Sequence, residues 1–174
     1  MSTPGFTLMR IFRMVLDPNN NAPIVILQDP EGGSLLPIWI GIFEAHAIAM
    51  KLEQIQAARP MTHDLLKGVL DSLGAALERV EVVDLVDNTY IARLQLRTGD
   101  TTYRVDSRPS DAIAVALRAD CPIFVADHVL EASKIDPANF KLDADKEEGE
   151  DGDEDEWTRM LKNYNPPGGR EKIN

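Results

Sequence analysis

The 174-residue sequence has only one cysteine and three histidines, and it has no long apolar segment. A single cysteine, Cys121, excludes an internal disulfide framework and is typical of a reducing, cytoplasmic environment. The same scarcity excludes a cysteine-rich structural zinc site. No apolar run approaches the ~20 residues that span a bilayer, and Arg10 and Arg13 interrupt the apolar N-terminus. We therefore expect neither a membrane span nor a signal peptide.

Basic residues are also scarce, because 18 Lys and Arg stand against 29 Asp and Glu and the formal net charge is −11. A nucleic-acid-binding surface is usually basic, so the whole-chain charge argues against one. The acid is concentrated, however, in residues 145–156, where nine of twelve side chains are acidic and none is apolar. Such a composition cannot form a core. We expect a folded domain over 1–142, a disordered acidic linker over 143–156, and a short helix with a tail over 157–174.

The last of these segments has apolar residues at the i, i+3, i+4 and i+7 spacing of a one-faced helix. They are Trp157, Met160, Leu161 and Tyr164. Two helical turns are too few to be stable alone. We therefore expect this segment to dock on its own domain or on a protein partner.

The remaining pattern predicts an α+β fold with a mixed, mainly antiparallel sheet and about three main helices. The predicted strands are 6–16, 23–28, 34–40, 77–86, 90–97, 101–106 and 123–125, and the predicted helices are 41–58, 62–73 and 111–119. The N-caps expected for the last two helices are Thr62 and Ser110. The predicted buried stripe of the second helix is Leu65, Leu66, Val69, Leu70 and Leu73. A hairpin followed by a helix occurs at 23–58 and again at 90–119, so the chain contains either a duplicated ββα unit or two unrelated buried helices.

The second hairpin has a predictable register. A two-residue turn at Gly99-Asp100 separates polar from apolar residues cleanly, whereas a three-residue turn mixes them. In that register Arg97 faces Thr102, Gln95 faces Arg104, and Arg93 faces Asp106. The polar face of the hairpin then carries Arg93, Arg97, Arg104 and Asp106.

Polar residues also gather at the ends of predicted elements, where binding groups commonly lie. They are Glu44, Arg59, His63, Asp64, Asp106, Arg108 and Asp111. One interpretation is structural, because carboxylates in first helical turns are favoured by the helix dipole and arginines form ion pairs with nearby acids. The other groups Glu44, Asp64, Asp106 and Asp111 as oxygen ligands of Mg²⁺ or Mn²⁺. A metal-held water would then attack a phosphodiester with His63 as general base. The sequence contains no glycine-rich phosphate loop, His-Glu-x-x-His or Gly-x-Ser-x-Gly motif.

Four strings along the chain resemble one known family. They are Leu-Pro-Ile-Trp-Ile-Gly at 36–41, Arg-Pro-Met-Thr-His-Asp-Leu at 59–65, Asp-Ser-Arg-Pro-Ser-Asp-Ala-Ile-Ala at 106–114, and Pro-Ile-Phe-Val at 122–125. In this order they resemble the bifunctional nuclease domain family, and the similarity runs from about residue 6 to residue 133.

The resemblance implies an α+β domain, often a homo-oligomer, with nuclease activity on DNA and RNA. It makes the polar loops the family's own motif positions without assigning a role to each residue. We expect a metal-assisted nuclease of broad specificity, and the alternative is a non-catalytic domain that binds a ligand or a protein partner. The expected catalytic residues are His63, Asp64, Asp106 and Asp111. The expected metal ligands are Glu44, Asp64 and Asp111, and the expected substrate-binding residues are Arg59, Arg93, Arg97, Arg104 and Arg108.

Overall fold

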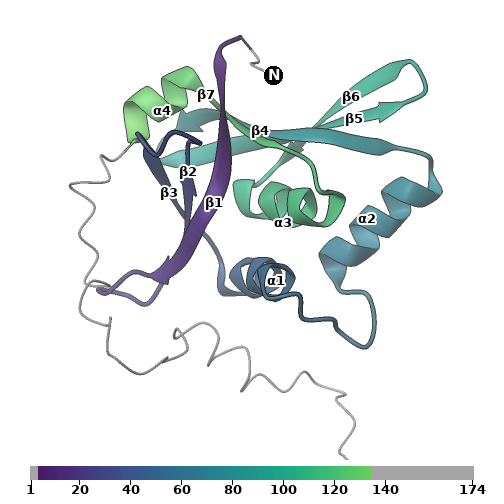
Figure 1. The fold of residues 1–174 in the computed structure, drawn as a ribbon, viewed down its shortest axis with the longest axis horizontal. Coiled ribbons are helices and arrows are strands. Elements are labelled where there is room, and N and C mark those ends of the chain that lie inside the picture. Colours follow the sequence, from purple (N-terminus) through teal and green to yellow (C-terminus); the bar gives the residue numbers. More distant parts are fainter. Residues whose placement is uncertain (1–3, 135–174) are drawn as a thin grey trace, which may run out of the picture.

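The computed structural model describes residues 4–134 and confirms the predicted α+β class (Figure 1). The predicted linker 143–156 and the predicted C-terminal helix and tail 157–174 lie outside the described residues. The strands are β1 Phe6–Leu16, β2 Pro23–Gln28, β3 Leu35–Trp39, β4 Ala76–Val86, β5 Thr89–Thr98, β6 Thr101–Ser107 and β7 Ile123–Ala126. The helices are α1 Ile42–Leu52, α2 Thr62–Ser72, α3 Pro109–Ala119 and α4 Asp127–Ser133.

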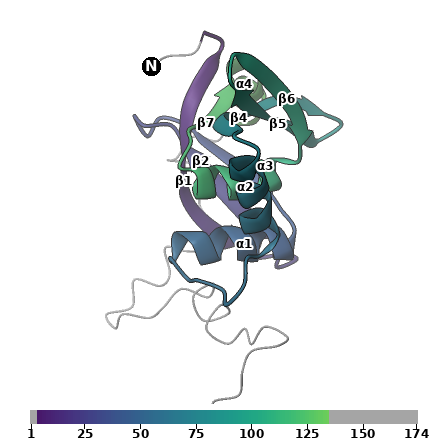
Figure 2. The same cartoon turned by 90° about the vertical axis from the view of Figure 1, so that its right-hand side faces the viewer.

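The seven strands form one mixed sheet in the order β3-β2-β1-β7-β4-β5-β6. All neighbouring strands are antiparallel except β4 and β7. Helix α3 lies at the centre of the helical layer, in contact with α1, α2, β4 and β5 (Figures 1 and 2). Its alanines at 112, 114 and 116 are fully buried, which lets the helix backbone approach its neighbours closely. The starts of α1, α2 and α3 carry half of the predicted site residues, namely Glu44, His63, Asp64, Arg108 and Asp111.

The hairpin register predicted for β5 and β6 is confirmed. Arg97 pairs with Thr102, Gln95 with Arg104, and Arg93 with Asp106. The turn contains Gly99 with a φ of 56°, a left-handed conformation that glycine adopts without strain. The arginines of β5 therefore share one face of the sheet, and its leucines share the other.

The two predicted hairpin–helix units are also present, as β2-β3-α1 and β5-β6-α3. Their helices α1 and α3 pack against each other. A common origin of the two units remains an interpretation, because hairpins followed by helices also arise independently.

Three predicted helix boundaries were wrong. Helix α1 ends at Leu52 rather than at residue 58, because Gln54 takes a left-handed φ of 56° that a right-handed helix cannot contain. Met61, not Thr62, is the N-cap of α2, and its N–H donates to the Asp64 carboxylate at 2.9 Å. Helix α3 begins at Pro109, since proline is favoured in the first helical position, so Ser110 is not its N-cap.

The predicted buried stripe of α2 was also largely wrong. Only Leu70 is buried, with 8% of its surface exposed. The other four side chains are 37–69% exposed, and we call them the α2 stripe: Leu65, Leu66, Val69 and Leu73. The helix packs on α3 along another flank, where Leu70 and His63 face inward. The α2 stripe is thus an apolar surface with no described element covering it.

The central packing of α1 on α3 predicts a stability difference between two substitutions in one helix. Ile48 is fully buried, whereas Leu52 is 41% exposed. We expect Ile48→Ala to lower the free energy of unfolding by about 2–5 kcal/mol, because it leaves a cavity. Leu52→Ala, the control, should cost less than about 1 kcal/mol. Urea unfolding followed by circular dichroism measures both, and equal losses would contradict the described packing.

Candidate functional site

Four of the predicted site residues are joined in a chain of contacts across the starts of three helices. The Nη2 of Arg108, the N-cap of α3, donates to Oε1 of Glu44 in the first turn of α1 at 2.6 Å. The Nε of Arg108 donates to Oδ2 of Asp111 at 2.6 Å. The other oxygen of Asp111 lies 3.0 Å from Nε2 of His63, in the first turn of α2. We call Glu44, Arg108, Asp111 and His63 the helix-start network.

Contacts within the network stabilise the charged forms of Asp111 and Arg108. Burial has the largest effect on the pKa of Asp111 and raises it, but hydrogen bonds and charge from Arg108 and His63 outweigh burial, so the pKa lies below its ordinary value. The hydrogen bonds to Asp111 and Glu44 raise the pKa of Arg108. Asp111 and Arg108 are therefore both ionised at neutral pH. The Arg108 side chain is nevertheless 65% exposed, whereas those of Glu44 and His63 are mostly buried.

Asp64 lies outside this network and has a different partner. Its Oδ1 accepts a hydrogen bond from Nε of Arg118 at 2.5 Å, and its Oδ2 accepts one from the Met61 backbone. Burial raises the pKa of Asp64, but these two donors and the nearby charges more than offset it, so the net pKa is lowered. The Arg118 guanidinium is buried and also donates to the carbonyl oxygens of Ala114 and Ala47. It thereby ties the start of α2 to α3 and α1.

Arg118 was missed by the sequence reasoning, although a signal for it exists. It lies seven residues after Asp111 on the same helix, so both side chains share a face of α3. Arg59, which was predicted as a substrate-binding residue, lies in the loop between α1 and α2 and lines a pocket together with Asp64 and Arg118.

The carboxylates predicted to hold a metal are thus engaged by arginines. Glu44 and Asp111 share Arg108, and Asp64 contacts Arg118. Asp106 is exposed on β6. Within residues 4–134, no group of three or more His, Cys, Asp and Glu side chains is arranged to hold a metal ion. These residues do not fit a preformed Mg²⁺ or Mn²⁺ site, and metal dependence remains a prediction.

The arginines of the hairpin belong to another surface. They alternate with Leu94 and Leu96, which face the helices, so their side chains point to the opposite face of the sheet. The carboxylate of Glu81 is buried and forms two ion pairs. One is with Nε of Arg93 at 2.5 Å, and the other is with Nη2 of Arg79 at 2.7 Å. Arg97 is paired with Glu78, and Arg104 is exposed on β6. Acidic side chains on β4 therefore neutralise much of the basic face predicted for the hairpin.

A pocket opens beside Arg108, at the ends of elements from both halves of the chain. It is lined by Trp39 at the end of β3, Asn88 in the β4–β5 turn, Tyr90 at the start of β5, and Arg108. Trp39 is 54% exposed, and its Nε1 donates to Oδ2 of Asp17 at 3.0 Å, which fixes the indole ring. Aromatic rings beside a guanidinium are suited to a base and its phosphate. We call this cavity the Trp39 pocket; Tyr90 had not been predicted as a site residue.

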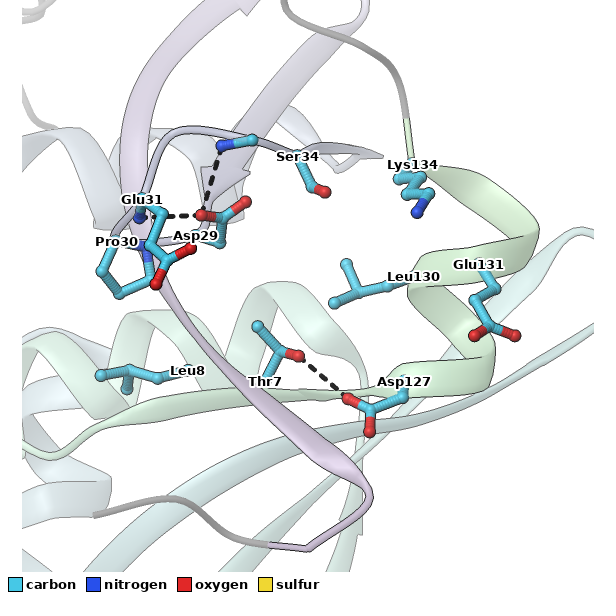
Figure 3. A pocket seen from close by; sticks show the side chains of 11 residues that line it. Thr7, Leu8, Asp29, Pro30, Glu31, Ser34, Asp127, Leu130, Glu131 and Lys134 are labelled. Carbon is cyan, nitrogen blue, oxygen red and sulfur yellow. Dashed lines mark hydrogen bonds between the residues drawn. The ribbon is translucent and has the colours of Figure 1, made fainter.

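A second pocket lies between β1, the β2–β3 turn and α4 (Figure 3). It contains none of the predicted site residues. Two of its carboxylates are held by local hydrogen bonds: Asp29 accepts from the backbone N–H of Glu31 and Gly33, and Asp127 accepts from the Thr7 hydroxyl. Their positions are explained by the turn and by the strand–helix junction, so the Trp39 pocket is the stronger candidate.

The chain contains an α+β domain in which the helix-start network joins Glu44 to residues of two of the strings noted in the sequence. Residues 25–138 match the bifunctional nuclease domain family, and the chain belongs to that family. This confirms the resemblance seen in the sequence.

Relatives include proteins with and without a functional name. The "Uncharacterized protein Rv1829" of Mycobacterium tuberculosis is 38% identical over 122 residues, which cover 70% of this chain and 73% of that protein. "Bifunctional nuclease 2" of Arabidopsis thaliana is 35% identical over 112 residues, covering 61% of this chain and 34% of that protein. "Bifunctional nuclease 2" of Oryza sativa subsp. japonica is 28% identical, covering 73% of this chain and 41% of that protein. This chain thus spans only about a third to two fifths of these two plant relatives.

The helices described between residues 4 and 134 include none with the length and apolar character that crossing a bilayer requires.

The lowered pKa of Asp111 predicts how stability depends on pH. A carboxylate whose folded pKa is depressed stabilises the protein above its ordinary pKa of 3.8, and this contribution is lost as pH falls through the lower folded value. We expect Asp111→Asn to lower the free energy of unfolding by about 1–3 kcal/mol at neutral pH. The gap between wild type and variant should shrink below pH 3.8.

The control for this prediction is Asp71→Asn, since within the described part of the chain the Asp71 carboxylate forms only an exposed pair with Lys67. It should change the free energy of unfolding by less than about 0.5 kcal/mol. Urea unfolding at a series of pH values measures both variants. A gap for Asp111→Asn that is constant with pH would show that its charge does not contribute.

Proposed function

We propose that this protein is a nuclease that hydrolyses phosphodiester bonds in DNA and RNA, with its centre at the helix-start network. The family and the names of the plant relatives support this class of activity. The observation that carries the proposal is the position of Arg108. Its exposed guanidinium lies at the Trp39 pocket and is fixed by Glu44 and Asp111, and Asp111 also contacts His63.

Arg108 is the residue that would contact the phosphate. A guanidinium has five N–H donors, and the contacts to Glu44 and Asp111 involve only its Nη2 and Nε atoms. Residues 4–134 place no other partner on this guanidinium, so its remaining donors can bind phosphate oxygens, on which negative charge grows in the transition state. Because Glu44 and Asp111 already hold the side chain, little reorganisation is needed when the substrate binds.

His63 is the proposed general base. Asp111 contacts Nε2 of its ring and orients it, which leaves Nδ1 to accept a proton from water. The water oxygen forms a bond to phosphorus, the bond from phosphorus to the leaving oxygen breaks, and His63 returns the proton to that oxygen. Asp64 and Arg118 act as positioning residues, since their ion pair fixes the first turn of α2.

Mg²⁺ or Mn²⁺ assistance is a separate part of the proposal. Mg²⁺ is often bound through one or two carboxylates, water and the phosphates of the substrate. The carboxylates of the network are engaged by Arg108, so no step above depends on a metal. The cleavage assay described below therefore compares Mg²⁺, Mn²⁺ and EDTA.

The alternative function is a non-catalytic domain that binds a ligand or protein. The ion pairs between carboxylates and arginines favour this alternative. Glu44, Asp64 and Asp111 each have an arginine partner that accounts for their position. In that case the network only holds the three helix starts around the Trp39 pocket.

A cleavage assay distinguishes the two functions. The purified full chain is incubated with single- and double-stranded DNA and RNA, with Mg²⁺, with Mn²⁺, or with EDTA. We expect His63→Asn and Arg108→Lys to slow cleavage about 10²–10³-fold, since they remove the base and the fixed phosphate donor. Lys67→Gln, which removes a positive charge from α2 outside the network, should cleave at the wild-type rate.

Two results would contradict this assignment. Unchanged cleavage in both variants, with folding verified by circular dichroism, would place the activity elsewhere. Binding of nucleic acid without cleavage under every metal condition would favour the non-catalytic function.

The acidic segment gives a further prediction about nucleic-acid affinity. Residues 143–174 carry 11 acidic and 5 basic side chains and would repel phosphates near the domain. We expect their deletion to tighten nucleic-acid binding, and we expect the gain to be largest at low salt. Fluorescence anisotropy with a labelled oligonucleotide at several salt concentrations measures the change. Equal affinity of the full and shortened chains at low salt would exclude competition by the tail.

A further inference from the structure

Ser110 has a buried hydroxyl that the fold itself does not use. The sequence predicted it as the N-cap of α3, but Arg108 takes that position and the helix begins at Pro109. Ser110 is only 6% exposed, and within residues 4–134 its hydroxyl forms no hydrogen bond. Buried hydroxyl groups are nearly always hydrogen-bonded, because leaving one without a partner costs free energy. This position therefore points to a partner that enters from outside the described residues.

The start of α3 has further donors that the helix does not satisfy. Its first hydrogen bond runs from the N–H of Ala112 to the carbonyl oxygen of Arg108 at 3.0 Å. The N–H groups of Ser110 and Asp111 precede it, so the helix supplies no acceptor for them. The N-cap side chain forms no hydrogen bond with them either. Such N–H groups, at the positive end of the helix dipole, are suited to binding an anion such as phosphate.

These donors lie at the Trp39 pocket, which both Ser110 and Arg108 line. The pocket has a volume of about 410 Å³, within the ~300–1,000 Å³ range of small-ligand sites. Arg108 shares its positive charge with the carboxylates of Glu44 and Asp111, so these three side chains have a formal net charge of −1. An anion beside Arg108 therefore needs uncharged donors as well. The Ser110 hydroxyl and the N–H groups of α3 supply them.

Other side chains that line the pocket are suited to a nucleobase. Tyr90 lies two residues before the buried Ala92 on β5, so its ring is on the side of the sheet that α3 covers. Ile38 adds apolar surface, and Asn88 adds an amide that can form hydrogen bonds with the edge of a base. An aromatic ring stacks on a base only when that base has left its duplex, because paired bases are already stacked on one another.

The charge of the domain also disfavours a duplex as the substrate. Binding of duplex DNA usually depends on many contacts between phosphates and a basic surface. Residues 4–134 instead carry 17 acidic and 12 basic side chains. Six of these basic side chains already form ion pairs with carboxylates of the same range. A pocket that holds a single nucleotide needs no such surface.

We propose that the Trp39 pocket binds one unpaired nucleotide, whose phosphate accepts hydrogen bonds from Ser110 and Arg108 at the start of α3 and whose base stacks on Tyr90. This inference rests on the proposed function, because it takes nucleic acid as the substrate. It makes Ser110 a substrate contact and makes single strands the preferred class of substrate. A duplex fits only after a base has left the stack, which costs free energy.

Isothermal titration calorimetry with adenosine 5′-monophosphate tests the pocket separately from cleavage, because this probe contains no phosphodiester bond. We expect the full chain to bind it more tightly than adenosine or inorganic phosphate, since only the whole nucleotide contacts both Ser110 and Tyr90. Ser110→Ala should weaken binding of the probe about 10–100-fold, as expected for a hydrogen bond to a charged group. Ser110→Thr keeps the hydroxyl and should retain most of the affinity. Equal affinity of Ser110→Ala and wild type would overturn the proposal.

Two further variants complete the calorimetry. Ser72→Ala is the matched control, because it removes a hydroxyl from α2 that donates to the carbonyl oxygen of Gly68 at 2.7 Å, outside the pocket. It should bind the monophosphate as the wild type does. Tyr90→Leu should weaken binding of the monophosphate, whereas Tyr90→Phe keeps the ring and should not. Unchanged affinity in Tyr90→Leu would contradict the stacking of the base.

Unfolding of the ligand-free Ser110→Ala variant separates a substrate contact from a structural one. The substitution removes a buried hydroxyl that has no partner in the described chain, so it should not destabilise the fold. We therefore expect the midpoint of urea unfolding, followed by circular dichroism, to be no lower than in the wild type. A lower midpoint would show that the hydroxyl supports the fold and would overturn its assignment to the substrate.

Fluorescence anisotropy tests the preference for unpaired nucleotides. A labelled oligonucleotide is titrated as a single strand and as a duplex in EDTA, and a gel verifies that both remain intact. We expect the single strand to bind about tenfold or more tightly and the monophosphate to displace it. Equal affinity for the two forms, or no displacement, would overturn the proposal. Binding of the monophosphate without cleavage of any nucleic acid would support this pocket and contradict only the proposed nuclease activity.

Discussion

The arrangement of the site depends on one arginine that holds two carboxylates. Arg108 joins Glu44 at the start of α1 to Asp111 at the start of α3, and Asp111 in turn contacts His63 at the start of α2. The starts of all three helices thereby lie close together. The buried Arg118, about two turns further along α3, makes similar contacts, because it connects Asp64 with carbonyl oxygens of α1 and α3. The polar motifs of the family are, in this protein, the contacts that fix the helical layer.

This construction leaves Arg108 both rigid and accessible. Its carboxylate partners are more buried than the guanidinium itself, which faces the Trp39 pocket. A fixed and exposed guanidinium is well suited to a phosphate, since the positioning is completed before the substrate arrives. The arginines of the β5–β6 hairpin lack this arrangement. Two of them form ion pairs with glutamates on β4, on the face of the sheet turned away from the helices.

Much of the fold could be predicted because its signals are local. The two-residue turn at Gly99 and the alternation along β5 set the hairpin register without reference to the rest of the chain. The end of α1 and the exposure of the α2 stripe could not be predicted in the same way. An apolar helical face is buried only if another element covers it, and in the described residues nothing covers Leu65 or Leu73. Periodicity indicates which residues share a face, and packing decides what that face contacts.

The sequence by itself determined the family, the α+β class, the hairpin register and the candidate residues, because each rests on neighbouring residues or on short strings. Only the tertiary structure decided how those candidates combine. It brought Glu44, His63, Arg108 and Asp111 together, assigned Asp64 to Arg118, and left Asp106 on an open edge strand. Ion pairs between residues 48 to 64 positions apart depend on how helices pack. Helix packing is set by the shape of the whole core, which no local pattern encodes.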